Sequence, residues 1–186
     1  MKKERFEAFT DAVIAIILTI LVLELHLPED DHSWMAILDV RMKFFAYVLT
    51  FIFIATMWVN HHYLFAQVKQ INGQIIWVNI LLLFWTSLLP ATTAWLGTDI
   101  HSVAASTLYN VNVLLFNITT AYLRRLVIKT NPIHDMHMLL IGELVSFSLN
   151  FITLIVSFFY PPFPFIGLSL NIMIWAVVGL RGRITV

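Results

Sequence analysis

The first apolar segment of the chain occupies residues 5–25 and reads RFEAFTDAVIAIILTILVLEL. Its beginning is charged, and no further charge interrupts it between Asp11 and Glu24. A helix needs about 20 mostly apolar residues to cross the hydrocarbon core of a bilayer. No small-residue cleavage site follows, because the segment leads to Pro28 and a run of acids. We therefore expect a retained membrane-spanning helix and not a cleaved signal peptide.

The composition of the whole chain also indicates a membrane protein. Of its 186 residues, 60% are hydrophobic and 12% are charged, whereas soluble domains carry about 25% charged residues. The formal net charge is zero, so no overall field attracts nucleic acid. The absence of cysteine excludes disulfides, thiol catalysis and cysteine-ligated metal. The sequence thus predicts an all-α integral membrane protein with no nucleic-acid partner.

Six segments are long and apolar enough to be membrane-spanning helices. Turn-forming residues separate them, such as Asn72-Gly73 and Tyr160-Pro161-Pro162. Residues 1–186 are then expected to form a single six-helix transmembrane domain, with a short interfacial turn of helix at Ser33–Leu38. The expected spans are Phe6–Leu25, Phe44–Phe65, Ile75–Leu96, Val103–Leu123, Met138–Phe159 and Phe163–Leu180.

The basic residues indicate the orientation of these helices. Every lysine and arginine except Arg41 and Lys43 precedes the first span, follows the sixth, or lies in the connections after the second and fourth. The connections on the opposite side carry acids, such as Asp30 and Asp99. Since cytoplasmic segments are enriched in lysine and arginine, we expect both termini to lie in the cytoplasm.

The first span carries one apolar stripe. Ile16, Ile20 and Leu23 follow i, i+4, i+7 spacing and share a face, and Thr19 lies about 60° from it. Asp11 is about 140° from Ile16 around the helix, so the two cannot face the same narrow lumen. From these residues alone, packing against other helices or lipid is sufficient to explain the stripe.

Polar groups inside the spans mark helix contacts or functional sites. Arg5 and Asp11 can pair at the membrane interface. The run Trp58-Val59-Asn60-His61-His62 lies at the depth of Asp11, where a histidine or asparagine can hydrogen-bond helix one. Adjacent histidines point about 100° apart on a helix, which is poor geometry for one metal ion. Hydrogen bonding between helices is therefore favoured over a metal site.

Two further polar sets lie in the later spans. Asn110 and Asn117 share a face of the fourth span and favour a role in helix packing over a polar path. Glu143 lies in the fifth span, where a carboxylate either has an ion or proton role or pairs with Arg124 or Arg125. Glycine-rich phosphate loops, Gly-x-Ser-x-Gly, His-Glu-x-x-His and the Thr-Val-Gly-Tyr-Gly potassium filter are all missing. We expect no enzyme, no cofactor and no metal.

The start of the first span resembles a known family. The pattern Arg5-x-x-x-Phe9-Thr10-Asp11 is similar to the signature Arg-x-x-x-Phe-Ser-Asp of the endosomal and lysosomal potassium channel family, transmembrane protein 175, and its bacterial homologues. Thr10 replaces the usual serine and keeps a hydroxyl. The similarity extends into the second and third spans at Trp58, Asn60-His61-His62, Asn79, Trp85, Ser87 and Pro90.

The resemblance implies a potassium-permeable cation channel that conducts passively in a bacterial inner membrane. One repeat is present, which in this family implies a homotetramer with the first helix of each chain lining the pore. Carried onto this sequence, the constriction is Ile16, Ile20 and Leu23, and Thr19 influences selectivity. The other motif residues would anchor helix one instead of contacting ions. They are Arg5, Phe9, Thr10 and Asp11 in helix one, with a network of Trp58, Asn60, His61 and Asn79 in helices two and three.

The sequence also allows two rival functions. A proton- or ion-coupled secondary transporter would use intramembrane carboxylates and histidines, such as Glu143, Asp11 and His61. Flux that saturates with substrate or requires a second ion would identify it. A membrane enzyme built on His61, His62 and Asp11 lacks both a nucleophile and a credible metal set.

Overall fold

The computed structural model describes residues 2–131 and 137–184, with the backbone alone described at 137–138 and 180–184. Every regular element in this part of the chain is an α-helix. The helices are α1 (Lys3–Leu23), α2 (Trp34–Asp39), α3 (Arg41–Ala66), α4 (Gly73–Ser87), α5 (Leu89–Thr98), α6 (Val103–Thr130), α7 (His137–Ser157) and α8 (Phe163–Ile184).

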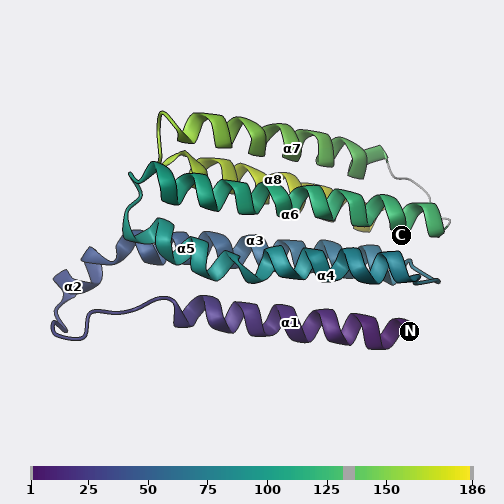
Figure 1. Ribbon diagram of the computed structural model, residues 1–186, viewed down its shortest axis with the longest axis horizontal. Helices are drawn as coiled ribbons and strands as arrows, with labels where there is room; N and C mark the ends of the chain where they lie inside the picture. The colour runs from purple at the N-terminus through teal and green to yellow at the C-terminus, as the bar shows by residue number, and fades with distance from the viewer. Residues whose placement is uncertain (1, 132–136, 185–186) are drawn as a thin grey trace.

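The long helices run side by side along the long axis of the molecule (Figure 1). Helix α1 lies at one edge, α3 and the α4–α5 pair lie next to it, and α6, α7 and α8 form the opposite side. The first residues of α1 and the last residues of α8 lie at the same end of the bundle, while α2 projects beyond the other end. Helix α1 therefore has one side against the bundle and another side free within a single chain.

Among the residues that the structure describes, five helical segments are long and apolar enough to cross a membrane. They are Lys3–Leu23, Arg41–Ala66, Gly73–Thr98, Val103–Thr130 and Leu139–Ser157. The expected third span, Ile75–Leu96, falls on two helices that meet at Leu88. Pro90 explains this break, because proline fits the first turn of a helix but not its interior. The expected sixth span, Phe163–Leu180, lies within α8, and the described apolar part of that helix is Phe163–Gly179.

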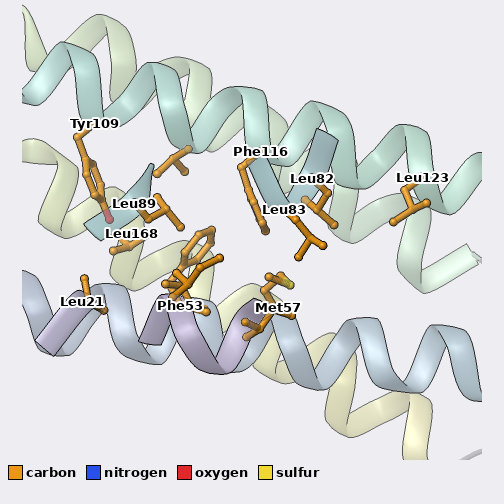
Figure 2. Packing of buried hydrophobic residues seen from close by; sticks show 14 of the residues in the cluster. Leu21, Phe53, Met57, Leu82, Leu83, Leu89, Tyr109, Phe116, Leu123 and Leu168 are labelled. Carbon is orange, nitrogen blue, oxygen red and sulfur yellow. The ribbon is translucent and has the colours of Figure 1, made fainter. Parts of the chain in front are cut away.

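Apolar side chains from both sides of the bundle meet in one core. Leu21 enters from α1, Leu168 from α8, and Met57 from α3 (Figure 2). At the centre, the rings of Phe53 and Phe116 pack edge to face with their centroids 5.1 Å apart. Lipid is as apolar as this core, so close packing and hydrogen bonds hold the helices together rather than a hydrophobic driving force.

Hydrogen bonds join α6, α7 and α8. Ser146 Oγ accepts bonds from Asn171 Nδ2 at 3.0 Å and from Trp175 Nε1 at 3.2 Å. Asn110 Nδ2 donates to Ser157 Oγ at 3.0 Å. All five side chains are buried. The packing role that the sequence predicts for Asn110 is therefore confirmed.

Gly97 marks a close approach of α5 to α3. A Cβ atom at residue 97 would lie 2.9 Å from the Cα atom of Lys43. Small residues allow neighbouring membrane helices to approach this closely. Gly73, at the beginning of α4, would place a Cβ atom with nothing within 4 Å. An added Cβ atom would therefore be crowded at residue 97 and free of contacts at residue 73.

We expect Gly97→Ala to destabilise the purified protein by about 1–3 kcal/mol, because overpacking forces backbone shifts of about that cost. Gly73→Ala is the control and should leave the thermal midpoint unchanged or slightly higher, since alanine favours helix more than glycine does. Thermal unfolding in detergent measures both variants. Equal midpoints would contradict the close approach of α5 to α3.

Candidate functional site

Helix α1 presents one continuous face to the rest of the chain. Its buried residues, Phe6, Thr10, Ile14, Ile17 and Leu21, recur every three or four positions, which places them on one side of a helix. This side packs on α3, α4 and α5. Four of the five side chains are apolar. Thr10 is polar and must find its hydrogen-bonding partner inside the protein, because hydrocarbon offers none.

A chain of hydrogen bonds joins Thr10 to α4 and α3. Asn79 Nδ2 donates to Thr10 Oγ1 at 2.9 Å, and the Thr10 hydroxyl donates to the carbonyl oxygen of Phe6 at 3.1 Å. His61 Nε2 lies 2.9 Å from Asn79 Oδ1. An amide oxygen only accepts hydrogen bonds, so this contact assigns the proton of His61 to Nε2. Thr10, His61 and Asn79 are all buried, and the bonds between them fix the position of α1.

The carboxylate next to Thr10 is bound by a tryptophan. Trp58 Nε1 of α3 donates to Asp11 Oδ1 at 2.8 Å. The Trp58 indole also stacks on the His62 ring, with the two centroids 5.9 Å apart. The sequence had suggested a histidine or asparagine as the partner of helix one at this depth. The structure places tryptophan there instead, because His61 is turned inward toward Asn79.

Phe6 belongs to the same site, although sequence reasoning did not single it out. Its side chain is 1% exposed. Its ring centroid lies 4.9 Å from that of Phe65 and 6.5 Å from that of His61, and His61 stacks on Phe65 at 4.4 Å. The signal that could have found it is its i, i+4 relation to Thr10. These rings surround the buried hydrogen bonds with apolar surface.

Three expected members of the site do not take part in these contacts. Arg5 and Phe9 are exposed, on the part of α1 that is turned away from its buried face. Asn60 Nδ2 donates to the carbonyl oxygens of Thr56 at 2.9 Å and Trp175 at 3.4 Å. It therefore joins α3 to α8 and not to α1. The expected residues that the chain brings together are Thr10, Asp11, Trp58, His61 and Asn79.

The apolar stripe of α1 is exposed on the single chain. Ile16 is 59%, Ile20 42% and Leu23 69% exposed. Thr19 beside them is exposed as well, and its hydroxyl donates to the carbonyl oxygen of Ala15 at 2.9 Å. A hydroxyl that donates one bond keeps an oxygen that can still accept. The stripe lies about 110° around the helix from the middle of the buried face.

The membrane carboxylate Glu143 is paired with an arginine. Arg124 Nη1 lies 2.5 Å from Glu143 Oε1, and both side chains are buried. The Arg124 guanidinium also lies over the Trp175 ring, 4.5 Å from its centroid. Of the two arginines that the sequence offered, Arg124 is the partner, while Arg125 is exposed. The contact ties α6 to α7 and pairs the Glu143 carboxylate with a cation inside the protein.

The chain is similar in sequence to a family of potassium channels. Residues 5–90 match the family described as the endosomal/lysosomal potassium channel TMEM175. A potassium channel from a Chryseobacterium species is 35% identical, over 97% of this chain and 96% of its own length. A potassium channel from Streptomyces collinus is 35% identical, over 55% of this chain and 51% of its own length.

A solved structure extends the similarity to the fold. The crystal structure of a lysosomal potassium-selective channel TMEM175 homolog from Chamaesiphon minutus matches with a TM-score of 0.65 and 27% sequence identity. The match covers 91% of this chain and 97% of that one. It therefore reaches well beyond residues 5–90, into the helices that carry the Arg124–Glu143 pair. The chain is an integral membrane protein of the TMEM175 potassium channel family, which is a family of channels and not of enzymes.

Proposed function

We propose that four copies of this chain assemble into a potassium-permeable channel with α1 lining the pore. The observation that carries the proposal is the division of α1 into two faces. Thr10 and Asp11 bind α4 and α3 of the same chain, while Ile16, Ile20 and Leu23 stay exposed. Four exposed faces around one axis would enclose a passage.

The small size of the cavity beside Arg124 supports a pore between copies instead of one through the single chain. One cavity in the described part of the chain lies between α3, α4, α6 and α8, beside Arg124 and Trp175. The volume that it offers to water is about 30 Å³, enough for roughly two or three water molecules. An ion path must cross about 30 Å of hydrocarbon, so this cavity cannot serve as one.

An apolar ring can control ion flow without a plug. Water leaves a narrow apolar passage, and an ion cannot cross it without hydration. Ile16 from four copies would form the first ring, followed by Ile20 and Leu23. Opening would require α1 to rotate or splay at these positions, while the hydrogen bonds of Thr10 and Asp11 hold its first turns in place.

Thr19 would provide the polar group next to this ring. Its hydroxyl oxygen can replace part of the hydration shell of a passing ion, as carbonyl oxygens do in other potassium channels. One hydroxyl per chain offers far fewer ligands than a ring of backbone carbonyls. We therefore expect only a modest preference for potassium over sodium.

We further propose that both termini lie in the cytoplasm of a bacterial cell and that the whole chain is one domain in the inner membrane. The basic residues support this orientation. The connection between α3 and α4, which contains Lys69, and the last turn of α6, which contains Lys129, lie at the end of the bundle where α1 begins. Helix α3 begins at the other end, and its first turn contains Arg41 and Lys43. Lysine and arginine are enriched on the cytoplasmic side of membrane proteins.

Ile16→Asn should raise potassium flux several-fold, because an amide in the narrowest ring retains water there. Flux from liposomes that contain the purified protein measures the effect. Ile152→Asn makes the same change at an exposed position of α7 and should leave the flux unchanged. An equal response of the two variants would reject α1 as the pore-lining helix.

Thr19→Ala should lower the preference for potassium over sodium, because Thr19 is the only exposed hydroxyl residue of α1. Reversal potentials with potassium on one side and sodium on the other measure this preference. Thr120→Ala is the matched control, since its hydroxyl donates to the carbonyl oxygen of Phe116 at 2.9 Å within α6. A selectivity that survives Thr19→Ala would remove this residue from the mechanism.

Asp11→Ala should reduce the yield of assembled protein more than it alters selectivity. The variant leaves Trp58 Nε1 without its acceptor, and a lost hydrogen bond of this kind costs about 1–3 kcal/mol. Asp11→Asn keeps an acceptor oxygen and should recover most of the yield. Size-exclusion chromatography and reversal potentials provide the two readouts. Full yield with altered selectivity would instead place Asp11 in the ion path.

A further inference from the structure

The outer face of α6 has the order of chemical groups found across one leaflet of a membrane. Its residues are spaced alternately three and four positions apart, which keeps them on one side of the helix. They are exposed except for the half-buried Leu115. In chain order they are Leu108, Val111, Leu115, Ile118, Tyr122, Arg125 and Lys129. Apolar side chains are thus followed by a tyrosine and then by two cations.

The length of α6 matches this order. The helix has 28 residues, so it is about 42 Å long and exceeds the hydrocarbon core of about 30 Å. Arg125 lies about 15 Å along the helix from Leu115, which is about half the thickness of that core. Tyr122 falls near the boundary with the headgroups, where tyrosine is enriched. Arg125 and Lys129 then lie at the level of lipid phosphates.

The neighbouring helices do not neutralise these two cations. Helix α6 packs against α4, α5, α7 and α8. Together these five helices contain one acidic residue, Glu143, and it is already bound to Arg124. Among the described residues, Arg125 and Lys129 form no ion pair. Within the described part of the chain, these two cations therefore have no acidic partner.

A third cation is held at the same end. Asn131 Oδ1, just after α6, accepts the backbone N–H groups of Lys69 and Gln70, each at 2.9 Å. Asn131 Nδ2 donates to the carbonyl oxygen of Gln70 at 3.1 Å. This buried amide ties the α3–α4 connection to the end of α6. It brings the exposed Lys69 to the level of Lys129.

We propose that this face binds one anionic phospholipid. Its phosphate lies between Arg125 and Lys129, its glycerol lies beside Tyr122, and an acyl chain follows Ile118 and Leu115. A phosphatidylglycerol headgroup provides the negative charge that the two cations require. Free phosphate carries the same kind of charged group, but it lacks an acyl chain that could contact the apolar side chains of this face.

Native mass spectrometry of the purified full chain, titrated with dioleoyl phosphatidylglycerol, tests the proposal. Each cation at a lipid surface contributes about fivefold to binding, so the double variant Arg125→Gln with Lys129→Gln should bind about 25-fold more weakly. The control, Arg41→Gln with Lys43→Gln, removes the same charge from the opposite end and should bind like the parent. Size-exclusion chromatography verifies that all three proteins are folded.

Two further ligands separate the possible sources of binding. Dioleoyl phosphatidylcholine has no net charge and should bind the parent and the double variant equally. Glycerol phosphate should bind far more weakly than the lipid, because it lacks acyl chains. Unchanged phosphatidylglycerol binding in the double variant, or an equal loss in the control, would overturn the site. Glycerol phosphate that binds as tightly as the lipid would overturn a phospholipid as its ligand.

Discussion

The hydrogen bonds of Thr10 and Asp11 determine how α1 is rotated about its own axis. These polar groups lie in the first turns of a membrane-spanning helix, where hydrocarbon cannot satisfy them, and Asn79 and Trp58 bind them from α4 and α3. With the rotation fixed, the side of α1 that carries Ile16 is left outside the bundle. A slip of one residue would turn that side by about 100°. The position of these two polar residues therefore decides which apolar side chains of α1 stay outside the bundle.

Hydropathy and turn residues are sufficient to find the helices of this chain because each span must be apolar over most of its length. The ends are harder to predict. Helix α6 continues to Thr130, well beyond the expected Leu123, because leucine, arginine and lysine favour helix as much as most apolar residues do. Pro90 divides the third span into two helices. A hydropathy average along the sequence cannot detect this break.

The site is only partly predictable, because its contacts depend on how neighbouring helices are rotated. Thr10 and Asp11 stand out as polar residues in an apolar segment. Phe6 does not stand out, since apolar residues surround it in the sequence. His61 points toward Asn79, and Asn60 contacts α8. Both contacts depend on how the helices pack together, which the periodicity of a single helix does not reveal. Arg5 and Phe9 fall on the part of α1 that the single chain leaves uncovered.

The Arg124–Glu143 pair also constrains how the protein is made. An isolated arginine within a span opposes insertion into the bilayer by about 2.5–3.5 kcal/mol. The two residues are 19 positions apart, in consecutive helices. Inserting α6 and α7 as one helical hairpin, with these two charges already paired, therefore costs less than inserting either helix alone.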